Sequence, residues 1–289
     1  GFAWDPARNA RTVIRGGYGI YFDSIQGAAY NRSFEMQPST IRTNLSNVPT
    51  LADPYAAYPG GTPFPAKRPS LADFGKYKFV RPVSGGVVDT ATVTGYTQNW
   101  NLTVERQLRS DLAVSIGYVG NHAIKISGAR ELNPAVFGPG ATTANTDARR
   151  IYASLGIGPM FIQSPYQFAN YNALQINVTK RPTRGLTLMA NYTWGKIMDI
   201  ISNTQTGQRG PRDPFNAWID RGPADFDVKH RSTVSFVYET PRVKRAALLL
   251  GDWQVNGILT LVSGLPFTVV SGRDNSFTAQ ARDSADRVG

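Results

Sequence analysis

Apolar and polar residues alternate along much of this chain, with the period of two that is typical of β-strands. The alternation predicts several long strands, the end of a further strand at Gly1–Pro6, and short strands at Phe79–Val83 and Pro266–Val270. The long strands are expected at Thr12–Phe22, Asn99–Leu108, Leu112–Gly120, Tyr171–Arg181, Leu186–Lys196, Val228–Thr240 and Trp253–Ser263.

The first clear hairpin has a register that satisfies its whole apolar face. Because side chains alternate between the two faces of a strand, one set of cross-strand pairs can bring all of the large apolar residues together. The expected pairs are Leu108 with Leu112, Val104 with Ile116, and Leu102 with Tyr118.

The connections between the predicted strands are short and long in turn. Arg109–Asp111 and Pro182–Gly185 are short, and Pro241–Asp252 is somewhat longer. The long polar stretches are Asp23–Gln98, Asn121–Asn170 and Ile197–Asp225. Tight turns on one rim and long loops on the other are typical of transmembrane β-barrels. The sequence therefore predicts an all-β fold, an antiparallel transmembrane β-barrel segment that forms an incomplete, open, curved sheet of about seven or eight long strands with long loops on one rim.

The two faces of the predicted sheet differ in chemistry. One face carries Asn, Gln, Thr and Ser rather than Lys and Glu, as expected for the lining of a water-filled lumen. The other face is apolar and is expected to contact lipid. The lipid-facing candidates are Leu102, Val104, Val114, Ile116, Leu174, Ile176, Val178, Leu188, Val234, Phe236, Val255, Leu259 and Leu261.

Aromatic residues gather toward the ends of the predicted strands. Such residues form girdles at the two membrane interfaces of transmembrane barrels. The general β propensity of aromatic side chains is the alternative explanation. The girdle candidates are Trp100, Tyr118, Tyr192, Trp194, Tyr238 and Trp253.

Composition excludes several protein classes. The 289 residues are 41% hydrophobic, and no run approaches the roughly 20 consecutive apolar residues of a membrane-spanning helix. Cysteine is absent, which excludes disulfides and thiolate metal sites. The chain begins at Gly1 without a signal peptide and stops within the polar segment Asp283–Gly289, so we expect residues 1–289 to be part of one barrel domain.

The net charge of +11 raises the question of a nucleic-acid partner. No basic helix and no aromatic-basic RNA signature accompanies the charge, so no nucleic-acid partner is expected. Solvated turns are the simplest explanation of the cations, and contact with anionic phospholipid head groups is the more specific one. The basic residues at or near the predicted turns are Arg8, Arg11, Arg106, Arg109, Lys180, Arg181, Arg184, Arg242, Lys244 and Arg245.

No arrangement of residues suited to catalysis is visible, so the protein is not expected to be an enzyme or to hold a cofactor. The two histidines, His122 and His230, are far apart in the sequence, and His230 lies between Lys229 and Arg231. Two flanking cations disfavour both protonation of this histidine and binding of a metal ion. Motifs for a nucleophile elbow, a zinc helix or a phosphate loop are also absent.

The richest polar cluster lies in Arg209–Arg231. Calcium is one ligand to consider, but the spacing is not that of an EF-hand and the arginines would compete for the carboxylates. We expect a network that braces an extracellular loop against the barrel rim, with Phe215, Trp218 and Phe226 anchoring the loop or contacting a substrate. The network candidates are Asp213, Trp218, Asp220, Asp225, Asp227 and Arg231.

Several segments resemble, in their expected order, the barrel of Oar-like TonB-dependent outer-membrane transporters. The segments are Gly1–Pro6, Thr12–Asp23, Gln98–Leu102, Tyr118–Gly120, Tyr171–Gln175, Ala190–Lys196, Gly222–Arg231, Trp253–Ile258 and Ser263–Thr268. The resemblance implies a barrel of 22 strands with a plugged lumen, of which this chain would be roughly a third of the wall. It also implies a plug and a TonB box, neither of which is present in this sequence.

The resemblance therefore implies a barrel-wall segment of a receptor that moves a substrate across the bacterial outer membrane. Its partners would be outer-membrane lipids, the TonB system through segments outside this sequence, and a substrate of unassigned class. Two alternatives stay open: a passive or adhesive outer-membrane barrel, and a soluble all-β carbohydrate-binding module that uses Tyr and Trp platforms.

Overall fold

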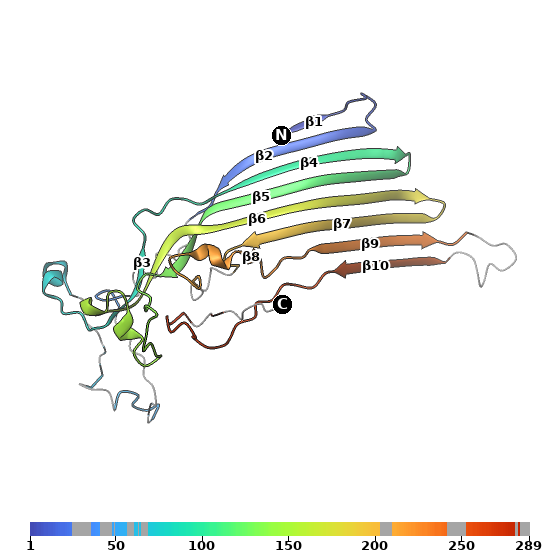
Figure 1. Cartoon of the computed structure of the whole chain (residues 1–289). Coiled ribbons are helices and arrows are strands. Elements are labelled where there is room, and N and C mark those ends of the chain that lie inside the picture. The colour runs from blue at the N-terminus through green and yellow to red at the C-terminus, as the bar shows by residue number, and fades with distance from the viewer. Residues whose placement is uncertain are drawn as a thin grey trace.

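The computed structural model describes residues 1–24, 36–40, 48, 50–56, 61, 62, 64, 69–202, 210–241, 253–280 and 283. Within these ranges the chain forms one ten-stranded sheet and four short 3-10 helices (Figure 1). None of these helices is long or apolar enough to cross a membrane. The strands are β1 (Phe2–Trp4), β2 (Thr12–Phe22), β3 (Val83–Val88), β4 (Tyr96–Arg109), β5 (Leu112–Glu131), β6 (Ile157–Thr183), β7 (Leu186–Asp199), β8 (Gly222–Pro223), β9 (His230–Glu239) and β10 (Gln254–Val262). The 3-10 helices are η1 (Leu71–Lys76), η2 (Asp147–Arg149), η3 (Ala153–Leu155) and η4 (Ala217–Asp220).

The long strands follow one another across the sheet in the order β1-β2-β4-β5-β6-β7-β9-β10, and each neighbouring pair is antiparallel. Two strands lie off this path: β3 pairs in parallel with β6, and β8 pairs with β7. In the described residues β1 and β10 are the two edges of an open sheet. The predicted all-β, antiparallel, open architecture is confirmed.

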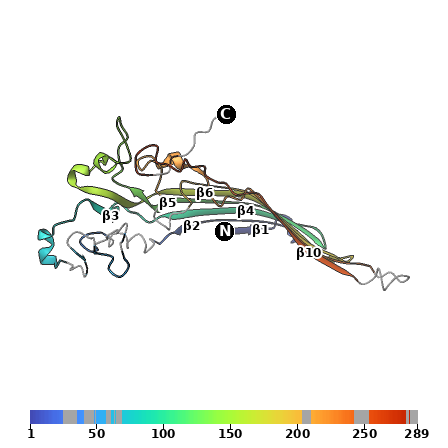
Figure 2. The same cartoon turned by 90° about the horizontal axis from the view of Figure 1, so that it is seen from below.

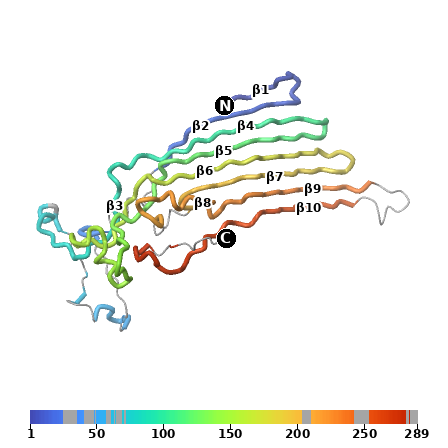
Figure 3. The backbone as a smooth tube through the Cα atoms, viewed as in Figure 1, coloured from blue at the N-terminus to red at the C-terminus, as the bar shows by residue number. Residues whose placement is uncertain are grey.

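The up-and-down order gives the sheet two different ends, which Figures 1 and 3 display on opposite sides. The turn end consists of the connections β1–β2, β4–β5, β6–β7 and β9–β10, although residues 242–252 of the last lie outside the described ranges. The loop end consists of the connections β2–β4, β5–β6 and β7–β9 and of the segment after β10. The expected separation of short and long connections is therefore present.

The β6–β7 turn illustrates how the sequence sets a tight connection. Arg184 and Gly185 both have positive φ, at 53° and 77°, which is the backbone pattern of a type I′ hairpin turn. A Cβ on Gly185 would lie 2.3 Å from the carbonyl oxygen of Glu239 on the neighbouring strand β9. Glycine is therefore needed here both for the backbone conformation and for the close approach of β9.

Strand β2 has the predicted bounds, and most of the predicted hairpin register is confirmed. Val104 pairs with Ile116 and Leu102 pairs with Tyr118. The predicted pairing of Leu108 with Leu112 is wrong, because Arg109 lies opposite Leu112 after a register shift. The connection is thus a two-residue turn, with one extra residue accommodated as a β-bulge in β4.

The structure corrects the prediction that Asn121–Asn170 is a loop. Strand β5 continues to Glu131 and β6 begins at Ile157, so both strands extend well beyond the predicted bounds. Register shifts at Ile126 interrupt the pairing, and Lys125 adopts a positive φ of 58°. The bulges destroy the period of two, which is why the alternation does not reveal this extension.

Two short predicted strands are also corrected. The strand expected at Phe79–Val83 lies instead at Val83–Val88, where Gly85 approaches another segment so closely that a Cβ would lie 2.5 Å from that of Met36. No strand forms at Pro266–Val270. Proline cannot donate to a ladder, and the following stretch is held instead by hydrogen bonds from the Thr278 and Ala279 backbone N–H groups to Asp274.

Among the described residues the main sheet is a single curved layer without a large hydrophobic core (Figure 2). The buried apolar residues are small or few, and most of them lie at the loop end. They are Ala123, Ala129, Ala135, Met160, Ala173, Ile200 and Ala224. Large apolar side chains of the sheet are exposed, for example Leu259 at 53% and Leu261 at 59%. In a soluble sandwich such side chains would instead be buried, because one face of each sheet packs against a second layer.

Candidate functional site

Cross-strand register collects all of the lipid-facing candidates on one face of the sheet, called here the apolar face. Residues paired across an antiparallel ladder point to the same side, so the face can be followed from strand to strand. One row contains Ile14, Val104, Ile116, Ile176 and Tyr192, and the next contains Val114, Val178, Ala190, Val234 and Leu259. Ser232 and Leu261 continue the first row on β9 and β10. Rows on either side add Leu102, Leu174, Leu188, Phe236 and Val255.

The apolar face changes character toward each end of the sheet. Toward the loop end, Tyr118 and Trp194 flank Leu174 in one row, and the next row holds Trp100, Asn172 and Lys196. At the turn end Tyr238 lies opposite Val255, and Trp253 precedes β10. The girdle candidates therefore lie on the apolar face, near its two limits, with Tyr192 one row further in.

The opposite face, called here the polar face, carries short polar side chains in continuous rows. One row contains Glu105, Ser115, Asn177, Asn191, Thr233 and Thr260, and the next contains Thr103, Gln175 and Thr193. The Asn121 amide donates a hydrogen bond to the Asn99 side-chain oxygen across β4 and β5. An exposed ion pair joins Arg15 to Glu105 at 3.7 Å. These groups form a hydrophilic surface without a buried reactive centre.

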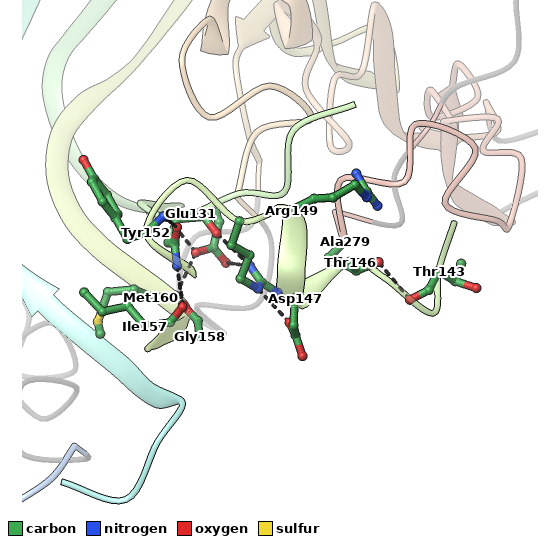
Figure 4. A network of polar contacts seen from close by, with 12 residues as sticks. Glu131, Thr143, Thr146, Asp147, Arg149, Tyr152, Ile157, Gly158, Met160 and Ala279 are labelled. Atoms are coloured by element: carbon green, nitrogen blue, oxygen red, sulfur yellow. Dashed lines mark hydrogen bonds and ion pairs between the residues drawn. The ribbon is translucent and has the colours of Figure 1, made fainter. Parts of the chain in front are cut away.

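A buried polar network holds the extended ends of β5 and β6 together (Figure 4). Both Glu131 and Arg150 have side chains that are 4% exposed, with 3.9 Å between the nearest guanidinium nitrogen and carboxylate oxygen. The Glu131 carboxylate also accepts hydrogen bonds from the backbone N–H groups of Asn133 and Met160, at 2.9 and 2.8 Å. Arg150 donates to the exposed carboxylate of Asp147 at 2.8 Å. A buried charge that is paired and hydrogen-bonded in this way is tolerated.

Asn133 completes this network. Its side chain is fully buried, donates to the carbonyl oxygens of Ile157 and Gly158, and accepts from the backbone N–H of Tyr152. Arg149 links the same loop to the segment after β10 by donating to the carbonyl oxygen of Phe277 at 2.7 Å. The loop end is therefore an ordered polar framework in its described part.

The predicted loop cluster forms two separate sets of contacts rather than one network. Arg212 pairs with Asp220 and also donates to the carbonyl oxygen of Ile219. The Asp227 carboxylate, 3% exposed, accepts from the Ile197 backbone N–H at 2.7 Å and from Lys196 at 3.0 Å. The two bonds to Asp227 brace the β7–β9 loop against the end of β7, whereas the Arg212 contacts lie within the loop.

Other members of the predicted cluster have local roles. Asp213 caps a turn through the Phe215 backbone N–H, and the backbone N–H of Asp225 donates to the Ser202 hydroxyl. Arg231 is the exception, because it is part of β9 and pairs with Thr193 on the polar face. The assignment of Arg231 to the loop network is therefore corrected.

Trp218 anchors the same loop by stacking on Phe168 of β6, with ring centroids 4.4 Å apart. Phe215 and Phe226 are exposed at 67% and 55% and have no stacking partner among the described residues. The anchoring role that the sequence suggested for the three aromatics is thus visible for Trp218. The two phenylalanines present apolar surface outward.

Asp199 is a buried carboxyl group at the loop end. It is the last residue of β7, beyond the rows that β7 shares with β9, and it is 7% exposed. Burial raises the pKa of Asp199, the hydroxyl of Ser202 that donates to it at 2.8 Å opposes this shift, and the nearby Asp225 charge adds to it. The group marks the point where the β7–β9 loop closes over the strand end.

The histidines do not form a site in the described residues. His122 lies opposite Asn170 in the β5–β6 pair, and His230 begins β9 with its Nδ1 atom 2.8 Å from the Tyr192 hydroxyl. No group of three or more His, Cys, Asp or Glu side chains in the described ranges is arranged to hold a metal ion.

Comparison with protein families decides what kind of sheet this is. A family described as an outer membrane beta barrel domain matches residues 1–289, the whole of the chain. The chain is an outer membrane beta barrel domain. Membership of this family places the barrel domain in the bacterial outer membrane. No curated protein matches the chain.

The buried network of this barrel domain is what the sequence did not reveal. Glu131, Asn133 and Arg150 lie in a stretch that was predicted to be an ordinary polar loop. One signal was available: charged residues at Arg130–Glu131 and at Asp147–Arg150 flank an uncharged segment, Leu132–Thr146. That spacing is expected of a loop that an ion pair closes at its base.

Proposed function

We propose that this domain is a wall segment of a TonB-dependent outer-membrane transporter. The observation that carries the proposal is a wide sheet with one apolar face and one hydrophilic face. Eight consecutive strands lie along the path from β1 to β10 without β1 pairing to β10. Eight strands are enough to close the smallest barrels, so this barrel is wider and encloses a lumen.

In this proposal the apolar face contacts lipid. On β7 the apolar band runs from Leu186 to Trp194, about nine residues, which matches the length of a strand that crosses a bilayer. Leu102, Ile116 and Leu259 are 49%, 49% and 53% exposed, a costly arrangement in water but a favourable one against acyl chains. The polar face then lines the lumen, and the loop end faces the outside of the cell.

The resemblance of nine ordered segments to Oar-like transporters supports the energised, TonB-dependent class over a passive barrel. The partners of the intact protein would be outer-membrane lipids, the TonB system and a transported substrate. The broad hydrophilic lumen face, rich in amides and hydroxyls, is suited to a polar substrate. An exposed apolar face in a single-layered sheet disfavours the soluble carbohydrate-binding module.

Two measurements on the intact protein test the proposal. Purified protein in detergent is titrated with the isolated periplasmic domain of TonB, and protein inserted into a planar bilayer is examined for ion conductance. A plugged, TonB-dependent transporter binds the TonB domain and conducts no steady current. A steady current without TonB binding would identify a passive pore, and neither TonB binding nor current would identify an adhesive barrel.

A further inference from the structure

We propose that Arg106 and Arg109 form a binding site for the phosphate of an anionic phospholipid headgroup, on the apolar face at the turn end. The inference rests on the proposed function in one respect, that the apolar face contacts lipid. It narrows the head-group contact that the sequence suggested for the turn cations in general to two residues, and it names the phosphate as their ligand. We assign a membrane lipid rather than a soluble phosphate as the ligand, because the two arginines lie beside the apolar residues of the wall.

Register places both arginines among the apolar residues rather than on the polar face. Arg106 lies opposite Val114, in the row that continues to Val178. The β-bulge in β4 brings Arg109 opposite Leu112, so its side chain shares the face of that residue. Without the bulge, alternation would have placed Arg109 on the polar face. The bulge thus adds a second cation to the apolar side of the rim.

The same row continues from Leu112 to Lys180 on β6. Arg109 and Lys180 are therefore two strands apart, about 10 Å between their backbones. Lys180 is already neutralised by Asp111, whose carboxylate lies 2.8 Å from its ammonium nitrogen. Arg106 and Arg109 are exposed and have no ion pair among the described residues. Two unpaired guanidinium groups remain, at the edge of the apolar band.

This arrangement fits a phospholipid headgroup better than bulk water. Long basic side chains at the edge of an apolar surface extend toward the interface while their methylene groups stay in the apolar region. The guanidinium group is suited to bidentate contact with phosphate. Short turns of outer-membrane barrels face the periplasm, so the arginines lie at the level of the headgroups of the inner leaflet.

The test uses the absence of cysteine from this chain. In the intact protein, Leu112→Cys places a fluorophore between Arg109 and Lys180, and Leu174→Cys places the same fluorophore on the same face, three rows nearer the loop end. Each protein is reconstituted into phosphatidylcholine vesicles with rising amounts of nitroxide-labelled phosphatidylglycerol or nitroxide-labelled phosphatidylethanolamine. Quenching gives the relative affinity of the two lipids at each position.

We expect phosphatidylglycerol to be preferred at position 112 and not at position 174. Each cation near a membrane surface contributes about fivefold in affinity for anionic lipid, so Arg106→Gln with Arg109→Gln should reduce the preference roughly thirty-fold. Raising the salt concentration should weaken the preference of the unchanged protein. The matched control, Arg221→Gln with Lys229→Gln, removes two exposed cations from the loop end and should leave the preference intact.

Three results would overturn the proposal or its basis, and they are distinguishable. Equal quenching by the two lipids at position 112, or a preference that survives the double arginine change, overturns the headgroup site alone. No quenching by either lipid at either position shows that the face does not contact lipid, and the wall assignment then fails as well. If the double variant does not insert, the single change Arg109→Gln and the salt titration of the unchanged protein decide the question.

Discussion

At the loop end, Arg150 is buried between Glu131 and Asp147, whereas at the turn end Arg106 and Arg109 project from the sheet without a carboxylate partner in the described residues. The two ends belong to the same strands and differ in what surrounds them. Loops that lack a large apolar core are held by internal polar contacts, so their buried charges are satisfied within the protein. The rim of short turns has no interior, so its cations are available to a partner outside it.

The largest effect should come from breaking the buried network. Glu131→Ala removes the buried carboxylate beside the Arg150 guanidinium, which keeps only the exposed Asp147 as an ion-pair partner among the described residues, and it removes the acceptor of two backbone N–H groups. The expected loss is about 3–5 kcal/mol in the local stability of the loop end. Hydrogen exchange of the inserted protein should show that protection in residues 132–156 falls by more than a hundredfold while the wall strands stay protected.

The matched control is Asp147→Asn, which alters the other partner of Arg150. Its carboxylate side chain is 72% exposed, and the amide oxygen can still accept the hydrogen bond. A change below about 1 kcal/mol is expected for an exposed pair. Equal effects of the two substitutions would contradict the view that burial, rather than ion pairing as such, makes the network important.

The second-largest effect should come from placing a charge on the apolar face of the sheet, between the turn end and the loop end. Ile116→Arg puts a charge in the middle of the apolar band, whereas Ser115→Arg puts the same charge on the polar face one residue away. If the apolar face contacts lipid, Ile116→Arg should cost about 2–4 kcal/mol in folding stability near the bilayer midplane, and Ser115→Arg much less. Urea unfolding in vesicles measures both. A larger cost for Ser115→Arg would reverse the assignment of the two faces.

Most of the wall could be predicted from the sequence because the sheet has one apolar face and one polar face. The alternation of apolar and polar side chains therefore indicates how the strands pair. Strand β2 and the pairs Val104 with Ile116 and Leu102 with Tyr118 follow from alternation alone. A slip of one residue would turn every large apolar side chain to the polar face. Because only one register keeps the large apolar side chains on one face, the alternation in the sequence is enough to predict it.

The loop end could not be predicted in the same way because its contacts are irregular. Beyond Ile124 the bulges in β5 break the period, and Asn133 binds partners 19 to 25 residues away through its side chain. No local rule specifies such a set. The single-residue bulge before Arg109 was missed for a related reason, since a bulge adds one residue without changing composition.

A smaller effect should show which aromatic residues of the β7–β9 loop anchor it and which are simply exposed. Trp218→Ala removes the ring stacked on Phe168 and should weaken closure of the β7–β9 loop by about 0.5–1.5 kcal/mol. Phe215→Ala, at a residue without a stacking partner among the described residues, should leave the loop unchanged. Limited proteolysis in the β7–β9 loop compares the two proteins. Equal susceptibility would assign the stacking pair no anchoring role.

The smallest effect concerns Asp111 in the β4–β5 turn, which forms an ion pair with Lys180 at the turn end. Hydrogen bonds from the Lys180 ammonium and the Thr183 hydroxyl lower the pKa of Asp111. Because the folded protein holds the proton less tightly than the unfolded chain, this carboxylate contributes stability at and above the ordinary carboxyl pKa. The contribution is lost as the pH falls through the lowered value. The advantage of the unchanged protein over Asp111→Asn should therefore persist from neutral pH into the acidic range and fade only below the ordinary carboxyl pKa.

Thermal unfolding of the two proteins in detergent across this pH range measures the difference, and its loss already near neutral pH would argue that the ion pair does not form. The same substitution also sharpens the comparison between the ends. Asp111→Asn releases Lys180 in the row that contains Arg109, so the turn end gains a third free cation beside the apolar band. Preference for phosphatidylglycerol at position 112 should then rise, even though the turn itself becomes less stable. One substitution should thus lower the stability of the turn and raise the preference for anionic lipid. This combination is expected only if Lys180 is neutralised by Asp111 within the protein while Arg106 and Arg109 bind lipid headgroups.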